Sequence, residues 1–403
     1  MENMLDMVNT TESQEGVVRC ELHTYQPFTH GLGNNDEIRI VINQQDVYTL
    51  PHDSYIYIEG RVEKVDGGGA STSQLNNNGL AFLFSEVKFE LNGLEIDSTK
   101  QVGVTSSLKL YPSFSKEECT PMKLAGWSPE GTNAWMKQPD GFFMGMLPLK
   151  HILGFAEDHK RIMVNVRQEL ILVRDRSDYN ALKAAETPVD SKITLQRVLW
   201  RVPHVTVSDR EKLRLLKLVE SDTPLPIRFR SWQLHEYPTL PTTDKHTWAV
   251  KTSRFTEKPL YVIVGFQTDR KFQHNKDASE FDHCNLRNMR LYLNGTSYPY
   301  ENMDIDFSKN KFGLLYDMFA KFQGSYYQKS NCPVFTPEEY KTSAPIIVMD
   351  CSYYEETPIQ SPVDIRLEFE TSSNIPAKTT AYCLIIHEAA AIYRPLSNIV
   401  TRI

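Results

Sequence analysis

The sequence predicts an all-β fold of two tandem β-sandwiches of the jelly-roll type, with short helices in the connections. The tripeptide Leu-Asn-Gly occurs at residues 91–93 and again at 293–295, and its two Asn residues are 202 positions apart in a chain of 403. Asn-Gly favours the positive φ angles of a two-residue hairpin turn. Gly, Asn and Pro also divide the rest of the chain into many short runs with β-strand patterning. These observations indicate one β-architecture built twice.

The sequence around each turn repeats as well. The runs 55–60 and 261–266, both rich in β-branched and aromatic residues, precede the two turns at similar distances. After each turn, apolar residues recur at helical spacing. These residues are Val104, Leu108 and Tyr111 in the first half, and Phe312, Leu315, Phe319 and Phe322 in the second half. The same order of strand, long loop, hairpin and helix in both halves indicates a duplication.

A helix marks the middle of the chain. Ser208 followed by Glu211 matches a capping box, and the helix is expected to end near Ser221, where residues 222–226 contain two prolines. We therefore expect a flexible N-terminal arm over residues 1–16, a first jelly roll over 17–207, a linker helix over 208–223 and a second jelly roll over 224–403. The expected strands are 18–28, 37–42, 54–62, 80–91, 161–173, 192–207, 227–234, 247–253, 260–268, 285–293, 346–351, 363–369 and 379–393.

Charge argues against strong direct binding of nucleic acid. The formal net charge is −7, whereas proteins that hold nucleic acid usually carry a basic patch that neutralises phosphates. We interpret the basic residues of the linker helix as its solvated side, opposite an apolar side of Leu213, Leu216 and Val219. These basic residues are Arg210, Lys212, Arg214 and Lys217.

The ends and inserts of the chain suggest two exposed segments. The N-terminal arm carries Glu2, Asp6, Glu12 and Glu15 with little apolar periodicity. Residues 66–74 are rich in Gly, Ser and Thr, and are expected to form an exposed, mobile loop whose polar character continues through residues 76–78.

Cysteine spacing and hydropathy indicate where the protein is made. The six cysteines lack metal-type spacing and follow no apolar signal segment, so we expect reduced, mostly buried thiols of a protein made in the cytosol or delivered to the nucleus. No run approaches the roughly 18 apolar residues of a transmembrane helix.

The sequence contains no recognisable catalytic, cofactor-binding or metal-binding motif. His283 and Cys284 are adjacent, and neighbours on a strand point to opposite faces, so a shared metal is not expected. Two acidic pairs, Asp304 with Asp306 and Glu355 with Glu356, are interpreted as solvated loop charges rather than glycosidase carboxylates. The Asn-x-Thr triplets at 9–11 and 294–296 are interpreted as coincidental. We therefore predict no catalytic, cofactor or metal residues, and no enzyme activity.

The duplicated pattern, residues 147–158, the strand 166–173 and the mid-chain residues 229–232 resemble double jelly-roll major capsid proteins of the tectivirus and adenovirus lineage. The similarity is greatest to those of Polinton (Maverick) elements, adintoviruses and virophages, and it extends from about Val17 to the C-terminus.

The resemblance implies a structural role in a virion. In such proteins three chains form a trimer with a pseudo-hexameric outline, and the trimers tile an icosahedral shell. It implies self-association into a homotrimer and a trimer lattice, penton and minor capsid proteins as further partners, and synthesis in the host cytoplasm with assembly there or in the nucleus.

Two other functions remain open at this point. A binding module, lectin-like or cytokine-like, requires only an exposed loop surface, although such modules are usually single sandwiches. A paired jelly-roll enzyme, such as a copper monooxygenase or an amidase, is less favoured because the copper enzymes would require His-x-His pairs, paired cysteines and a secretion signal.

Overall fold

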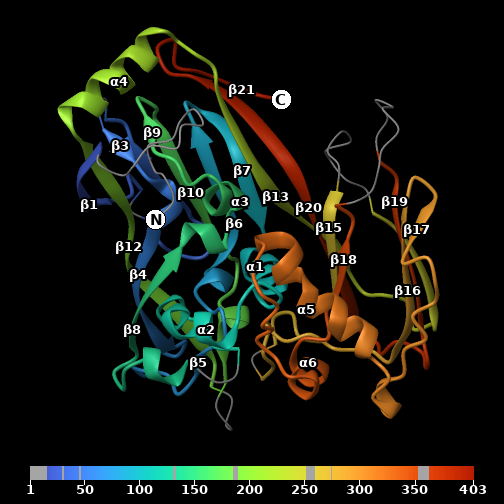
Figure 1. The fold of residues 1–403 in the computed structure, drawn as a ribbon. Helices are drawn as coiled ribbons and strands as arrows, with labels where there is room; N and C mark the ends of the chain where they lie inside the picture. The colour runs from blue at the N-terminus through green and yellow to red at the C-terminus, as the bar shows by residue number, and fades with distance from the viewer. Residues whose placement is uncertain are drawn as a thin grey trace.

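The computed structural model describes residues 16–29, 31–44, 47–129, 133–184, 189–250, 259–273, 275–352 and 363–403. Its strands form two β-sandwiches that lie side by side (Figure 1). The first half of the chain contains β1 (Val17–Tyr25), β2 (Glu37–Ile42), β3 (Tyr48–Thr49), β4 (Tyr55–Lys64), β5 (Gln74–Leu75), β6 (Phe84–Leu91), β7 (Leu94–Lys100), β8 (Phe142–Pro148), β9 (Met163–Val164), β10 (Gln168–Arg174), β11 (Leu182–Lys183) and β12 (Ser191–Val207). The second half contains β13 (Leu225–Tyr237), β14 (Lys245–Val250), β15 (Pro259–Thr268), β16 (Leu286–Leu293), β17 (Thr296–Tyr298), β18 (Ile347–Asp350), β19 (Ile365–Thr371), β20 (Thr379–Arg394) and β21 (Ile399–Arg402).

The two sandwiches have the same strand order. In the first, sheet 1 runs β1-β12-β4-β8, with the short β3 paired to β12 and the short β9 paired to β3, and sheet 2 runs β2-β10-β6-β7. In the second, sheet 3 runs β13-β20-β15-β18 with β21 attached to β20, and sheet 4 runs β14-β19-β16-β17. Eight strands of each half therefore correspond one to one in chain order, with the two four-stranded sheets of a jelly roll in each sandwich.

The two Asn-Gly turns occupy equivalent places in this topology. Asn92 and Gly93 join β6 to β7, Asn294 and Gly295 join β16 to β17, and all four residues have positive φ. In each turn the backbone N–H of the Asn donates to the backbone carbonyl of the residue that precedes the neighbouring strand. The side-chain Oδ1 of the same Asn accepts from the backbone N–H of that residue. The partner of Asn92 is Arg167, at 2.9 and 3.0 Å, and the partner of Asn294 is Asp364, at 3.1 and 2.8 Å. The duplicated hairpin predicted from sequence is confirmed.

Each predicted run overlaps a strand, and residues 251–253 of one run lie outside the described residues. The predicted hairpins imply a second strand after each turn, and these strands are β7 and β17, although neither has a range among the predicted runs. The sequence did not indicate β8, where Gly145 and Pro148 weaken the β pattern, or the short β21.

The six α-helices lie in the connections, as expected. They are α1 (Val102–Leu110), α2 (Lys116–Met122), α3 (Gly154–Asp158), α4 (Asp209–Glu220), α5 (Gly313–Tyr327) and α6 (Pro337–Ser343). Helices α1 and α5 follow the two equivalent hairpins, which confirms the helices predicted from the spacings after each turn. In the described ranges, no helix has the length and apolar character needed to cross a bilayer.

Helix α4 begins at the predicted residue, but it packs against the protein with a side different from the predicted one. The Ser208 hydroxyl accepts from the Glu211 amide. The buried residue is Leu215, which packs with Val205 and Val207 of β12, whereas Leu213 is 61 % exposed and Leu216 is 41 % exposed. The predicted apolar side was therefore wrong for Leu213 and Leu216, whereas Val219 is partly buried and packs against the same cluster as Leu215. The small cluster on β12 selects Leu215, and Leu213 lies on the opposite side of the helix.

The predicted mobile insert is exposed only in its first part. Residues 65–69 are exposed, but Ser71 and Ser73 are buried against Ser191 of β12, with oxygen-to-oxygen distances of 2.6 and 2.9 Å. The three Asn residues that follow are also buried, and the Asn78 side chain donates to the Ser106 hydroxyl of α1 at 2.7 Å. The prediction of an exposed loop over residues 66–74 therefore holds for residues 66–69 and Thr72, and is wrong for Ser71 and Ser73, whose hydroxyls have partners inside the protein.

One apolar core runs through both sandwiches. A single buried cluster includes residues from all four sheets and from α1 and α5. Cys119, Cys284, Cys351 and Cys383 are buried, whereas Cys20 and Cys332 are exposed. The sandwiches are thus joined by continuous packing rather than by a linker alone.

The equivalence of the hairpins predicts matched mutational effects. Asn92→Ala and Asn294→Ala remove the side-chain acceptor and place a Cβ-bearing residue without local hydrogen bonding at positive φ, so each should lower the free energy of unfolding by about 2 kcal/mol. The glycine variants Asn92→Gly and Asn294→Gly lose the side-chain hydrogen bonds, which for Asn92 include a donation from Nδ2 to the Asn398 carbonyl at 2.8 Å, but carry no penalty for positive φ, so they should cost about half as much. Chemical denaturation measures all four; a large loss at one turn and none at the other would contradict the equivalence.

Candidate functional site

The adjacent His283 and Cys284 have separate partners. His283 accepts from the Asn285 amide at its Nδ1 at 2.9 Å and stacks on Phe307. The Cys284 sulfur lies 3.8 Å from the Thr268 hydroxyl, and burial raises the pKa of this thiol to about 11. A thiol that is protonated at neutral pH is a poor nucleophile and a poor metal ligand.

The acidic pair Asp304 and Asp306 lacks the properties of glycosidase carboxylates. Asp304 forms an ion pair with Lys311, whose hydrogen bond lowers the pKa of this carboxyl. Hydrogen bonds from Ser308 and Lys309 lower the pKa of Asp306 to about 2. A glycosidase general acid needs a raised pKa, so neither carboxyl fits that role. Glu355 and Glu356 and the triplet at 9–11 lie outside the described residues, and the described ranges contain no cluster of three His, Cys, Asp or Glu side chains that could hold a metal.

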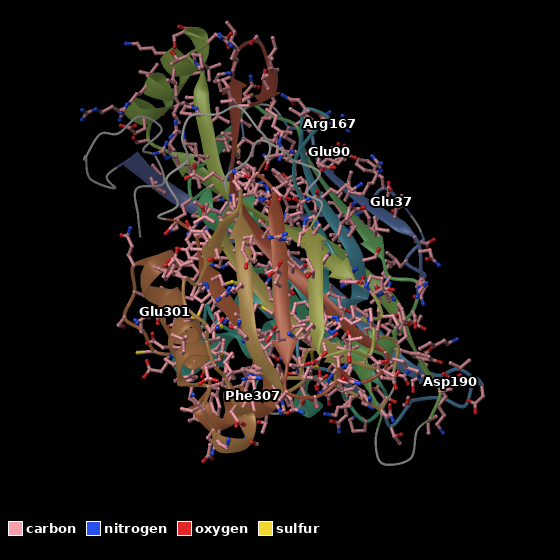
Figure 2. All side chains as sticks on the ribbon, turned by 90° about the vertical axis from the view of Figure 1, so that its right-hand side faces the viewer. Glu37, Glu90, Arg167, Asp190, Glu301 and Phe307 are labelled. Atoms are coloured by element: carbon pink, nitrogen blue, oxygen red, sulfur yellow. The ribbon has the colours of Figure 1, made fainter. Side chains whose placement is uncertain are left out.

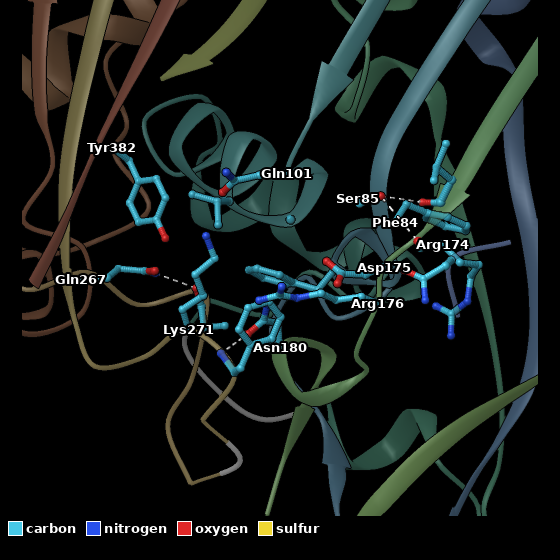
Figure 3. A pocket seen from close by; sticks show the side chains of 17 residues that line it. Phe84, Ser85, Gln101, Arg174, Asp175, Arg176, Asn180, Gln267, Lys271 and Tyr382 are labelled. Carbon is cyan, nitrogen blue, oxygen red and sulfur yellow. Dashed lines mark hydrogen bonds between the residues drawn. The ribbon is translucent and has the colours of Figure 1, made fainter. Parts of the chain in front are cut away.

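A cleft of about 420 Å³ lies where the two sandwiches meet (Figure 3). Its walls include Arg174 and Asn180 from the first sandwich and Gln267, Lys271 and Tyr382 from the second. The polar groups of these walls bond mainly to the protein itself. Arg174 pairs with the buried Asp178 at 2.8 Å, Lys271 pairs with the partly buried Glu236 at 2.7 Å, and the Gln267 amide donates to two backbone carbonyls. The cleft is therefore a seam between the sandwiches rather than a set of converging catalytic groups.

The two sandwiches also meet where residues 147–158 contact residues 229–232, the segments on which the resemblance depended. We call this region of contact the junction. Phe155 of α3 packs edge-to-face on Phe229 of β13, with ring centroids 5.7 Å apart. Asp97 of β7 is buried between the segments and accepts from the Phe155 amide at 2.9 Å and the Ser231 hydroxyl at 2.8 Å. The segments therefore join the first sandwich to the first strand of the second.

Gly154 allows the closest approach across the junction. A Cβ atom at this position would lie 1.8 Å from the backbone carbonyl oxygen of Arg230 and 3.2 Å from the Trp232 indole nitrogen. Only glycine lets α3 lie against β13 at this distance.

A buried ion pair lies beside this contact. Lys109 of α1 has a side chain with 0 % exposure, and its ammonium group donates to the hydroxyl of Ser113 at 3.2 Å, the carboxylate of Glu157 at 3.0 Å and the hydroxyl of Tyr327 at 2.6 Å. All three donors of the ammonium group are used. It also lies 4.1 Å from the ring centroid of Tyr326.

Lys109 and Glu157 each shift the pKa of the other. Burial lowers the pKa of Lys109 to about 8, against the opposing attraction of Glu157. Burial would raise the pKa of Glu157, but Lys109 and hydrogen bonds from Tyr326 and Tyr327 outweigh it and lower that pKa. The carboxylate is therefore held charged, and Glu157 of the first sandwich is tied to α5 of the second.

A second ion pair completes the junction. Two nitrogens of Arg230, the guanidinium Nε and the backbone nitrogen, each donate to the Asp158 carboxylate at 2.8 Å. The guanidinium Nη1 donates to the Tyr326 backbone carbonyl at 2.9 Å. The guanidinium also stacks on the Tyr326 ring, 3.5 Å from its centroid. Asp158 and Tyr326 belong to different sandwiches, so Arg230 connects both.

The outer faces of sheets 2 and 4 are charged. On sheet 2, Glu169 accepts from Arg39 at 3.0 Å and from Arg167 at 2.8 Å, and Glu37, Glu90 and Arg167 project along this face in Figure 2. On sheet 4, Lys245 pairs with Glu370 at 3.3 Å. Cross-strand charge pairs of this kind suit faces in contact with water.

Some of the exposed large apolar side chains lie together on a few elements, while others, such as Trp135 and Tyr300, are scattered. Val18 and Leu22 on β1 and Phe28 just after it are exposed, as are residues of α4 and of the C-terminal segment. Exposed apolar groups that gather on one element suit contacts between proteins.

The close contact at Gly154 predicts a large effect of one methyl group. Gly154→Ala should lower the free energy of unfolding by about 3 kcal/mol, because the added Cβ meets backbone and cannot be relieved by a side-chain rotation. Gly313→Ala is the matched control, since a Cβ at that position in α5 meets nothing within 4 Å. Equal melting temperatures of the two variants would contradict the contact.

The buried pair at Lys109 predicts a similar penalty. Lys109→Met leaves Glu157 charged and unpaired, and should cost about 3–5 kcal/mol. Lys321→Met removes the exposed pair with Asp317 on α5 and should cost less than about 1 kcal/mol. Denaturant titration of both variants checks this, and a small effect of Lys109→Met would show that the pair does not hold the junction.

Comparison with known proteins gives a family and a fold. Among curated protein sequences none matches this chain significantly. Among solved structures, the chain is similar to the PBCV-1 capsid protein VP54 fitted into a reconstruction of the virophage Sputnik, with a TM-score of 0.63, 11 % identity and 98 % of each chain covered. It is also similar to the mavirus major capsid protein, with a TM-score of 0.56, 11 % identity and coverage of 95 % of this chain and 90 % of that one. The Faustovirus major capsid protein aligns with a TM-score of 0.58, 10 % identity and coverage of 96 % and 92 %.

A model of the double jelly roll-like domain matches residues 73–391, which include both Asn-Gly hairpins and the whole junction. With its two matched eight-stranded sandwiches, the chain belongs to the double jelly roll-like domain family.

Proposed function

We propose that this protein is a major capsid protein, a structural subunit that forms homotrimers and tiles an icosahedral viral shell. The observation that carries the proposal is the one-to-one match of two jelly rolls, fixed side by side, in a chain that aligns over nearly its whole length with virophage and giant-virus capsid proteins.

The duplication suits a pseudo-hexameric capsomer. Two similar sandwiches in each of three chains give six similar wedges around a threefold axis, and closed cyclic symmetry is the ordinary arrangement of homo-oligomers. The wedges stay equivalent only if the two sandwiches keep one relative orientation. The buried contacts of Gly154, Lys109 and Arg230 supply that rigidity.

The domain limits follow from the same arrangement. We propose an arm over residues 1–16, a first jelly roll over 17–207, a linker over 208–223 and a second jelly roll over 224–403. We also propose that the protein has no catalytic, cofactor or metal residues, in keeping with the structural contacts of Cys284, Asp304 and Asp306. Its further partners are penton and minor capsid proteins, and it resides in the virion after synthesis in the host cytoplasm and assembly there or in the nucleus.

Strand β1 is the surface that we assign to the contact between subunits. It is bonded to β12 on one side, and it carries the exposed Val18 and Leu22. An edge strand with exposed apolar side chains favours association with another chain. The charged outer faces of sheets 2 and 4 suit this contact less well.

Mass photometry at low micromolar or lower concentration tests the proposal. The wild-type protein should show one species at three times the 46.4 kDa chain mass, and negative-stain images should show particles with a hexagonal outline. Leu22→Arg should shift the population toward monomer, whereas Leu124→Arg, at another exposed leucine, should not.

Two results would count against different parts of the proposal. A wild-type monomer at micromolar concentration would contradict the capsid function. A trimer that both substitutions leave intact would remove β1 from the interface and leave the function standing.

A further inference from the structure

The outer side of α4 combines exposed leucines with basic residues. Leu215 anchors the helix on β12, and Leu213 and Leu216 are exposed on its free sides. Arg210, Lys212 and Lys217 are exposed around them, together with the acidic Asp209 and Glu220 at the two ends of the helix, and Arg214 pairs with Glu211 at 3.6 Å. Figure 1 shows α4 at one end of the molecule, away from the junction near α1 and α5. We call the outer side formed by these two leucines and three basic residues the α4 surface.

The N-terminal segment leaves the fold directly beside this surface. Val17 pairs with Val207, the last residue of β12, and the Gly16 carbonyl accepts from the amide of Ser208, the N-cap of α4, at 2.8 Å. Residues 1–15 are therefore tethered at the first turn of the helix.

The composition of this segment complements the α4 surface. Residues 1–15 contain four acidic residues and no Lys, Arg or His. They also contain five aliphatic residues, Met1, Met4, Leu5, Met7 and Val8. The aliphatic groups of the segment match the exposed leucines of α4. Its four carboxylates match the excess of basic residues on this helix, which has four basic and three acidic side chains.

The tether also has a suitable length. Helix α4 has 12 residues and is about 18 Å long, while a flexible chain of 15 residues spans on the order of 20 Å. A short tether gives an effective concentration in the millimolar range, which favours the chain's own segment over that of a second copy.

We propose that residues 1–15 dock on the α4 surface of their own chain, with their aliphatic side chains against Leu213 and Leu216 and their carboxylates near Arg210, Lys212 and Lys217. This docking covers the exposed leucines of α4. It does not depend on the capsid function.

Photo-crosslinking tests the docking in the full-length protein. Benzoylphenylalanine in place of Leu213 should crosslink to a peptide from residues 1–15, identified by mass spectrometry. Benzoylphenylalanine in place of Leu314, an exposed leucine of α5, is the matched control and should give at least tenfold less of this product. In an equal mixture of ¹⁴N- and ¹⁵N-labelled protein, each crosslinked pair should carry a single isotope.

A charge swap tests the electrostatic part. Lys212→Glu with Lys217→Glu should lower the crosslink yield at least fivefold, and adding Glu2→Lys with Asp6→Lys should restore it. Both lysines are exposed, so the melting temperature should stay unchanged and show that the fold is intact.

Three results would overturn the proposal. A yield of crosslinks from position 213 to residues 1–15 that is no higher than the yield from the control at position 314 would contradict the docking. Mixed-isotope pairs would assign the surface to the segment of a second copy. Flotation of the full-length protein with phosphatidylglycerol vesicles, lost in Leu213→Ser/Leu216→Ser, would assign it to an anionic membrane instead.

Discussion

The contact of α3 with β13 is the constraint on which the rest of the structure depends. Gly154 brings the helix against the Arg230 backbone, and this approach places Glu157 and Asp158 within reach of Lys109 and Arg230. A side chain at position 154 would push α3 away from β13, which would break the Asp158–Arg230 pair and the bonds that Lys109 and Glu157 make to Tyr326 and Tyr327 of α5. The relative orientation of the two jelly rolls, and hence the shape of the subunit, follows from a backbone contact that only glycine permits.

The charges at the junction fix orientation more than they add stability. Burying an ion pair carries a desolvation penalty that can equal its attraction, and replacement by apolar groups is often neutral. Apolar packing across the junction is already extensive, because one cluster runs through both sandwiches. Three bonds from Lys109 and a forked contact from Arg230 have strict geometry, however, so sliding of one sandwich on the other would leave buried charges unpaired. We interpret the pairs as a means of holding one arrangement out of several that apolar contacts alone would allow.

Local signals in the sequence predicted the repeated parts of the fold well. Asn-Gly turns and alternating strands depend on neighbouring residues, which is why both hairpins, their flanking strands and the helices after them were predictable. Segments whose environment comes from distant residues were not. The polar residues Ser71 and Ser73 suggested an exposed loop, but Ser191 provides a partner for both hydroxyls. Leu213 and Leu215 are equally apolar, and only the position of β12 decides which one is buried. The junction itself carried a signal, since residues 147–158 and 229–232 stood out by resemblance, but nothing local shows that they touch.

Differential scanning calorimetry of the wild-type protein tests most directly whether the junction makes the two jelly rolls one unit. Continuous packing and the buried pairs predict a single cooperative transition for the whole chain, with a calorimetric enthalpy of about 0.7 kcal/mol per residue. If the whole chain unfolds as one unit, this calorimetric enthalpy should equal the van 't Hoff enthalpy of the transition. Two well-separated transitions, each accounting for about half of the enthalpy, would show that the sandwiches unfold independently and would contradict the central role of the junction.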